Sequence, residues 1–198
     1  MDLVGVDGRT DVEKLHELLA LGGERTQVDF KETLDLSDKR EELCFVKDAV
    51  AMLNYYPGGY IVIGADNEGN PSDRSEGTDW KQFDGARLRD KLKRYIDGPF
   101  DIASATHVEK GHTYCIICLM SSKNGLPIPF KKLGQAGNND VVFHKGEFVR
   151  RNGAQNAEIE YSQWGEILEQ HDKLIREDES RRVNDLIERF TASFAERG

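Results

Sequence analysis

Three acidic residues have the types and spacing that could support chemistry. Glu24 and Asp29 frame the stretch "ERTQVD", and Asp66 follows the apolar run "YIVIGA". The alternation predicts that Asp29 points away from the strand face that Val28 and Phe30 bury, and that Asp66 lies at the carboxyl end of a buried strand. Carboxylates that converge at strand ends are hard oxygen ligands of the kind that bind Mg²⁺ or Mn²⁺ beside a phosphate. The alternative, which spacing alone favours, is that these acids are solvated.

Basic residues are concentrated in one later part of the chain. Lys131, Lys132, Arg150 and Arg151 fall within about twenty residues, and Lys31 lies in the first predicted strand. Lysine and arginine side chains on adjacent strands would neutralise a phosphate backbone, so we predict that these five residues form one nucleic-acid-binding groove. The alternative is ordinary surface charge in a chain with 27 lysines and arginines.

Two other motifs are weaker. Cys115 and Cys118 have the spacing of a zinc knuckle, but positions i and i+3 of a strand face opposite sides, and no second Cys/His pair lies nearby. We therefore expect core cysteines and no zinc. The stretch "GADNEGNP" lacks the GxxxxGK pattern, which argues against a nucleotide-binding loop.

Composition restricts the class of protein. The chain has 198 residues, 38% of them hydrophobic and 32% charged, with a formal net charge of −9. This acidity argues against an obligate, non-specific nucleic-acid coat protein, which is usually basic. No apolar run is long enough to span a bilayer, the first residues do not resemble a secretory signal, and the three cysteines form no disulfide framework. We expect a cytoplasmic protein with no membrane partner.

The elements that must position these residues follow from periodicity and capping. Helices are predicted over 11–21, with a Thr10–Glu13 capping box, over 38–54, with Ser37 as N-cap, over 85–97 and over 161–196. Strands are predicted over 27–34, at "YIVIGA", as a hairpin of "FDIASATHVEK" with "TYCIICLM", and as two strands about the Lys-Gly turn of "VVFHKGEFVRR". We expect an α+β fold with a mixed, mainly antiparallel sheet flanked by helices and a long C-terminal helix.

The last helix carries two apolar stripes separated by the polar stretch "REDESRR" at 176–182. We expect the first stripe to dock on a domain of residues 1–170, and residues 171–198 to form a helical extension. The second stripe consists of Val183, Leu186, Ile187, Phe190 and Phe194. Left uncovered, this stripe would expose a larger apolar patch than monomers usually tolerate, so we predict a homodimer. The alternative is that the chain folds back at 176–182 and covers its own domain.

Three stretches in order are similar to those of a known family. "ERTQVDFKETL", "AMLNYYPGGYIVIGADNEGNP" and "VFHKGEFVRRNGAQNAEI" resemble the Schlafen-type AlbA domain, also known as the divergent AAA domain, over roughly residues 20–170. The resemblance implies nucleic-acid binding. In Schlafen proteins the domain is a metal-dependent endoribonuclease that acts on tRNA and rRNA, and its catalytic acids correspond to Glu24, Asp29 and Asp66. It also implies that these acids bind Mg²⁺ or Mn²⁺.

The sequence departs from the family pattern at three points. Asp29 replaces a glutamate, which shortens the side chain by about 1.5 Å; Asn54–Tyr55 replaces Asn-Thr; and the zinc site of animal Schlafens has no counterpart. The resemblance predicts binding of RNA in preference to DNA, with cleavage as the catalytic interpretation. The alternative is a non-catalytic regulatory or DNA-binding module that dimerises through its C-terminal helix. Pairing of two such domains in animal Schlafens is a second argument for a homodimer.

Overall fold

The main sheet has four strands in the order β1-β2-β4-β3. In the computed structural model, which describes the backbone of residues 4–195 and the side chains of residues 4–192, β1 (Val28–Lys31) runs parallel to β2 (Gly58–Ile63). The long strands β3 (Asp101–Glu109) and β4 (His112–Met120) form an antiparallel hairpin, and β4 pairs antiparallel with β2. The predicted mixed, mainly antiparallel sheet is confirmed.

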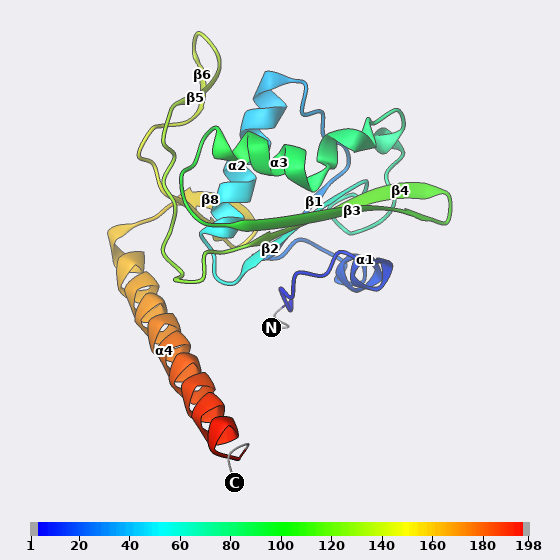
Figure 1. The fold of residues 1–198 in the computed structure, drawn as a ribbon. Helices are drawn as coiled ribbons and strands as arrows, with labels where there is room; N and C mark the ends of the chain where they lie inside the picture. The colour runs from blue at the N-terminus through cyan, green and yellow to red at the C-terminus, as the bar shows by residue number, and fades with distance from the viewer. Residues whose placement is uncertain (1–3, 196–198) are drawn as a thin grey trace.

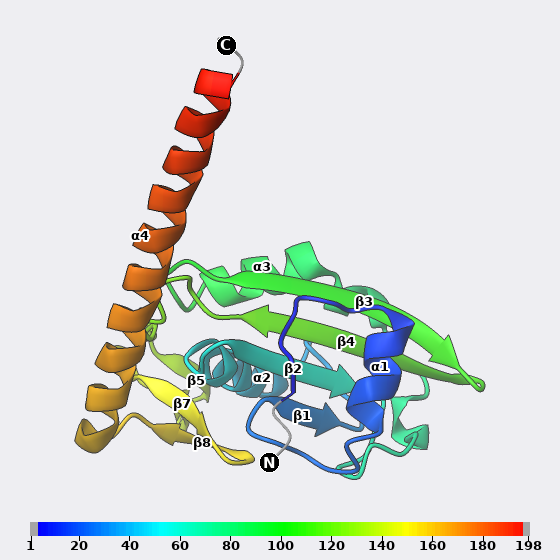
Figure 2. The same cartoon turned by 90° about the horizontal axis from the view of Figure 1, so that it is seen from below.

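Helices cover both faces of this sheet (Figures 1 and 2). On one face, α1 (Val12–Leu19) packs against side chains that include Val28 and Phe30. On the other, α2 (Lys39–Leu53) and α3 (Gly85–Lys93) bury a larger cluster. Because successive strand residues alternate between the faces, Cys118 lies in the first cluster and Cys115 in the second. The expectation of two core cysteines on opposite faces is confirmed.

The two principal helix caps differ by one residue from the prediction. Asp11, rather than Thr10, caps α1 by accepting from the backbone N–H of Lys14 at 2.9 Å. Asp38, rather than Ser37, caps α2. In both cases the carboxylate sits next to the predicted hydroxyl and adds negative charge at the positive end of the helix. Three short 3₁₀ helices, η1 (Asp73–Ser75), η2 (Trp80–Phe83) and η3 (Tyr161–Gln163), lie in the connections.

Two small hairpins follow the main sheet. β5 (Gly134–Gly137) pairs with β6 (Asp140–Phe143), and β7 (Val149–Asn152) pairs with β8 (Gln155–Glu158). The two short strands predicted about the Lys-Gly turn are β6 and β7, but they belong to different hairpins and do not pair with each other. The backbone of the turn bonds to Phe130 instead: Gly146 donates to its carbonyl at 2.7 Å, and Glu147 accepts from its N–H at 3.1 Å.

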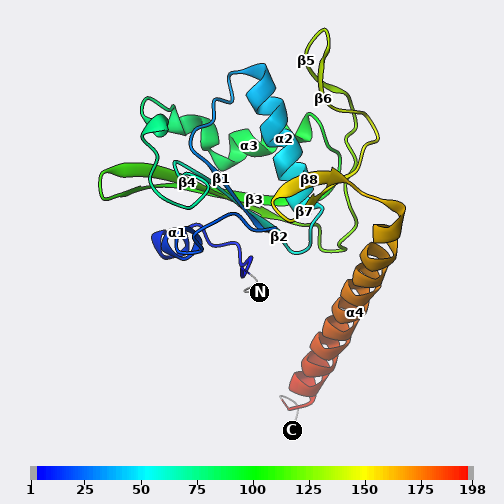
Figure 3. The ribbon, with the colours of Figure 1, turned by 180° about the vertical axis from the view of Figure 1, so that it is seen from behind.

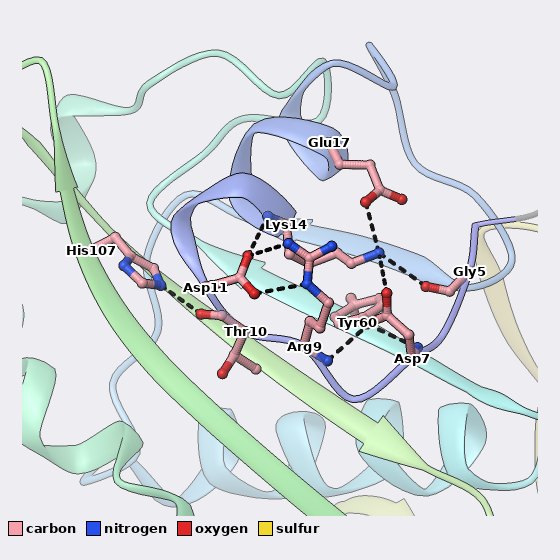
Figure 4. Close-up of polar contacts among 9 residues, drawn as sticks. All are labelled: Gly5, Asp7, Arg9, Thr10, Asp11, Lys14, Glu17, Tyr60 and His107. Carbon is pink, nitrogen blue, oxygen red and sulfur yellow. Dashed lines mark hydrogen bonds and ion pairs between the residues drawn. The ribbon is translucent and has the colours of Figure 1, made fainter.

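Polar contacts hold the N-terminal segment across the α1 face of the sheet (Figure 4). The Lys14 side chain is only 1% exposed, and its Nζ lies 3.2 Å from Asp7 Oδ2 and 2.8 Å from Glu17 Oε2. On β3, His107 Nε2 donates to the carbonyl of Thr10 at 2.6 Å. These contacts fix the segment that precedes α1, so it forms a wall of the domain.

The C-terminal helix α4 (Trp164–Ala195) is continuous and projects away from the domain (Figures 1 to 3). The chain does not fold back at 176–182. Ile167 and Leu174 are buried, but Leu168 is 52% and Ile175 40% exposed, so only part of the first predicted stripe docks. The Phe194 side chain lies outside the described part of the structure. Over the described residues, no helix combines the length and apolarity that crossing a membrane requires.

Candidate functional site

Glu24 and Asp29 form an acidic pair at β1. Asp29 is 6% exposed. Since Val28 and Phe30 face α1, Asp29 faces the α2 side of the sheet. Glu24 lies half-buried just before the strand. Burial and the negative charge of Asp29 raise the pKa of the Glu24 carboxyl, although a hydrogen bond from the Phe30 amide partly opposes the shift. The Asp29 carboxylate is thus close enough to Glu24 to disfavour its negative charge.

Asp29 belongs to a buried ion network that joins β1 to α2. Lys31 Nζ lies 3.0 Å from Asp29 Oδ2 and 2.6 Å from Asp48 Oδ2. Asn156, on β8, donates to Asp48 Oδ1 at 2.6 Å. Burial opposes the charge of Lys31, but the Asp48 and Asp29 carboxylates raise its pKa above the ordinary value. Lys31 is therefore held as a cation between two acids.

Arg151 completes this network from β7. Its side chain is 2% exposed, with Nη1 3.5 Å from Asp29 Oδ1. It also donates to the carbonyls of Thr26 and Arg25, each at 3.3 Å. Arg151 thereby fixes the segment between Glu24 and Asp29. Lys31 and Arg151, two of the five predicted phosphate-binding residues, thus make their contacts with carboxylates and carbonyls of the protein itself.

Asp66 lies in a turn after β2 and caps it. Its Oδ1 accepts from the backbone N–H groups of Glu68 at 3.0 Å and Asn70 at 2.8 Å, and its Oδ2 accepts from the Asn70 side chain at 3.1 Å. These hydrogen bonds lower the pKa of Asp66, and the bond from the Asn70 side chain has the largest effect. Within residues 4–192, no three acidic, histidine or cysteine side chains are grouped closely enough to hold a metal ion. Glu24, Asp29 and Asp66 are not grouped in that way in this structure, and whether they share a metal ion stays a prediction.

An open cleft of about 580 Å³ lies beside Glu24. Its walls come from the N-terminal segment, the end of α1, the segment before β1, the residue after the Asn54 cap of α2, and the β7–β8 turn. They are formed by Val4, Ala20, Leu21, Glu24, Arg25, Thr26, Gln27, Tyr55, Gly153 and Ala154. The Arg150 guanidinium lies 5.0 Å from the centre of the Tyr55 ring, and its Nη1 lies 3.7 Å from Glu166 Oε2 on α4.

The remaining predicted cations lie at the start of the β5–β6 hairpin. Lys131 and Lys132 are exposed, and Lys132 Nζ lies 4.5 Å from the centre of the Tyr95 ring. Of the five predicted residues, these two are exposed to solvent, Arg150 and Lys31 are half-buried and Arg151 is buried. Whether the five act as one groove stays a prediction.

Three residues near the site escaped sequence reasoning. Asp48 and Asn156 meet across 108 positions of the chain, a pairing with no local signal. Asn54 is buried; its amide donates to the carbonyls of Ile128 and Val149 at 3.0 and 2.8 Å and accepts from Ile128 N–H at 2.7 Å. Asn54 therefore anchors the beginning of β7, which carries Arg150 and Arg151. The sequence did hold one signal for Asn54, since it occupies the asparagine position of the Asn-Thr family motif.

Comparison with known proteins identifies a family for this chain. The family model described as Schlafen, AlbA_2 matches residues 24–160. Among solved structures, the DIP2311 protein from Corynebacterium diphtheriae is similar, with 16% identity and a TM-score of 0.49 over 79% of this chain. The match covers 27% of that chain, so the present chain spans only about a quarter of it. No curated protein matches the sequence. Because the family match includes well over half of its residues, the chain belongs to the Schlafen AlbA_2 family.

Proposed function

We propose that this protein is a nucleic-acid-binding domain with RNA as its favoured ligand. Family membership over residues 24–160 is the observation that carries the proposal. The exposed lysines 131 and 132 support it, because they offer cations to phosphates on a molecule with a net charge of −9. Arg25, exposed at the rim of the cleft beside Glu24, offers a third.

Fluorescence anisotropy with labelled RNA and DNA strands of one sequence tests this proposal. RNA should bind more tightly than DNA. The logarithm of the association constant should fall with the logarithm of salt concentration by about 0.7 for each phosphate contacted in a single strand. An affinity that does not respond to salt, or no binding to either strand, would refute the proposal.

A second candidate function is divalent-metal-dependent endoribonuclease activity. The proximity of Glu24 to Asp29 supports it, because paired carboxylates are Mg²⁺ or Mn²⁺ ligands. A bound metal would supply neutralisation of phosphodiester charge. To join the pair, Asp66 would have to release the hydrogen bonds of its own turn, and Asp29 is already paired with Lys31 and Arg151. The chain's own residues would bind and orient the RNA.

Incubation with tRNA, with Mn²⁺ or with EDTA, tests cleavage. The catalytic proposal expects Mn²⁺-dependent fragments that Glu24→Gln and Asp66→Asn both abolish, while RNA binding by Asp66→Asn stays near that of the wild type. Full activity of Asp66→Asn would remove Asp66 from the catalytic set. RNA binding without cleavage under any metal would favour the alternative of a non-catalytic regulatory or DNA-binding module.

The third part of the proposal is a homodimer formed through α4. Val183, Leu186 and Ile187 are 55%, 54% and 56% exposed on a helix that projects from the domain. A two-fold contact between matching stripes would bury them. Light scattering should give the mass of a dimer, and Leu186→Glu should give a monomer, whereas Asn184→Glu on the same helix should not. A monomeric wild type would refute the proposal.

A further inference from the structure

We infer that the cleft beside Glu24 binds one unpaired nucleobase stacked on Tyr55, an inference that rests on the proposed nucleic-acid function. The cleft volume of about 580 Å³ lies within the range of roughly 300–1,000 Å³ typical of small-ligand sites. Four of its lining residues are aliphatic: Val4, Ala20, Leu21 and Ala154. Apolar walls suit the flat faces of a ring and are unfavourable for a phosphate, so the base rather than the backbone fits inside.

Tyr55 is the aromatic side chain of this lining, and its surroundings fix it in place. The preceding residue, Asn54, is anchored by its three buried hydrogen bonds. The Tyr55 carbonyl accepts from Gly58 N–H at 2.6 Å and from Ser121 Oγ at 3.3 Å. The Arg150 guanidinium packs 5.0 Å from the ring centre, at the distance of a cation–π contact. A ring that is held before the ligand arrives loses little freedom on binding, which favours stacking.

The polar groups of the cleft match the rest of a nucleotide. The Glu24 carboxyl offers an acceptor to the amino group of a base, and the exposed Arg25 at the rim offers a cation to its phosphate. In a duplex the Watson–Crick edge of a base is occupied by pairing and its faces by stacking, whereas a base in a loop, a bulge or a single strand can turn out. The ligand class is therefore nucleic acid with unpaired bases.

A single-stranded RNA with 2-aminopurine at one position tests the inference, because the emission of this base changes when it stacks on an aromatic ring. Binding to the wild type should change the emission. Tyr55→Ala should weaken binding roughly ten-fold and abolish the emission change, since stacking of one base on an aromatic side chain contributes about that much. Tyr55→Phe should retain both. Tyr56→Ala is the matched control, because Tyr56 is 40% exposed and lies outside the cleft lining.

Two results would overturn the inference while the proposed function stands: RNA binding by the wild type with no change in emission, or equal affinity and emission change in Tyr55→Ala. The first needs no variant and so is independent of whether Tyr55→Ala folds. If the wild type binds no RNA at all, the proposed function fails and the inference fails with it. A perfect RNA duplex should bind Tyr55→Ala and the wild type alike.

Discussion

The cations beside β1 are buried or half-buried in the domain, and those that precede β5 lie on its surface. Arg151 is buried and contacts Asp29 and two backbone carbonyls, and Lys31 lies between Asp29 and Asp48. Lys131 and Lys132, by contrast, are exposed. An unpaired charge is costly to bury. Lys31 and Arg151 are compatible with folding because carboxylates and carbonyls surround them. The interior cations therefore position the acidic pair, while the exterior cations are accessible to phosphate.

The interior region is balanced in charge, with Asp29 and Asp48 facing Lys31 and Arg151. In such a network the partners cannot be removed singly without leaving a buried charge uncompensated. The exterior lysines have no comparable constraint, because water solvates them. The two regions should therefore respond in opposite ways to substitution: the first in stability, and the second in binding.

The largest effect is expected from Arg151→Met. The substitution leaves Asp29 without its arginine and removes a donor from each of the carbonyls of Arg25 and Thr26, so the unfolding free energy should fall by about 3–5 kcal/mol. Lys132→Met, the matched exterior change, should stay within about 0.5 kcal/mol of the wild type. Urea denaturation measures both. Equal losses in the two variants would contradict the distinction between interior and exterior cations.

Asn54→Ala tests whether charge or simple hydrogen bonding dominates in the interior. It removes an uncharged amide that makes three buried bonds, and it should lower the unfolding free energy by about 2–3 kcal/mol. Asn138→Ala, at the exposed turn of the β5–β6 hairpin, is the control and should change stability little. A loss from Asn54→Ala as large as that from Arg151→Met would mean that unsatisfied backbone groups, rather than an uncompensated charge, determine both.

Local patterns predicted what depends on neighbours in the chain. The apolar run "YIVIGA", the hairpin closed at 110–111 and the alternation that separates Cys115 from Cys118 were all recovered. The placement of Arg151 was not, because its burial depends on Asp29, which lies 122 residues away. For the same reason, "VVFHKGEFVRR" showed two strands but not their partners, which are β5 and β8, nor that Phe130 takes the backbone bonds of the turn.

For the exterior region, we expect the double substitution Lys131→Gln, Lys132→Gln to weaken RNA binding about ten-fold without a change in stability. If each lysine contacts one phosphate, the slope of the salt dependence should also fall by about 0.7 per lysine. Lys110→Gln, an exposed lysine in the β3–β4 turn, is the control. Unchanged affinity and slope in the double variant would show that these two lysines are ordinary surface charge.

The smallest effect is expected at Glu24, which lies beside the interior network and lines the cleft. Burial and the Asp29 charge raise its pKa in the folded state, so the folded protein binds this proton more tightly than the unfolded chain does. Stability should therefore fall as pH rises through the ordinary glutamate value of about 4.3 towards the raised folded value. Glu24→Gln has no such proton and lacks this loss. Between pH 4 and pH 7 its stability should therefore rise relative to that of the wild type, by less than about 1 kcal/mol. Urea denaturation at several pH values measures the difference. The opposite result would be a wild type that gains stability relative to Glu24→Gln between pH 4 and pH 7. It would show that the fold stabilises this carboxylate, and Glu24 would then belong with the structural ions of the interior.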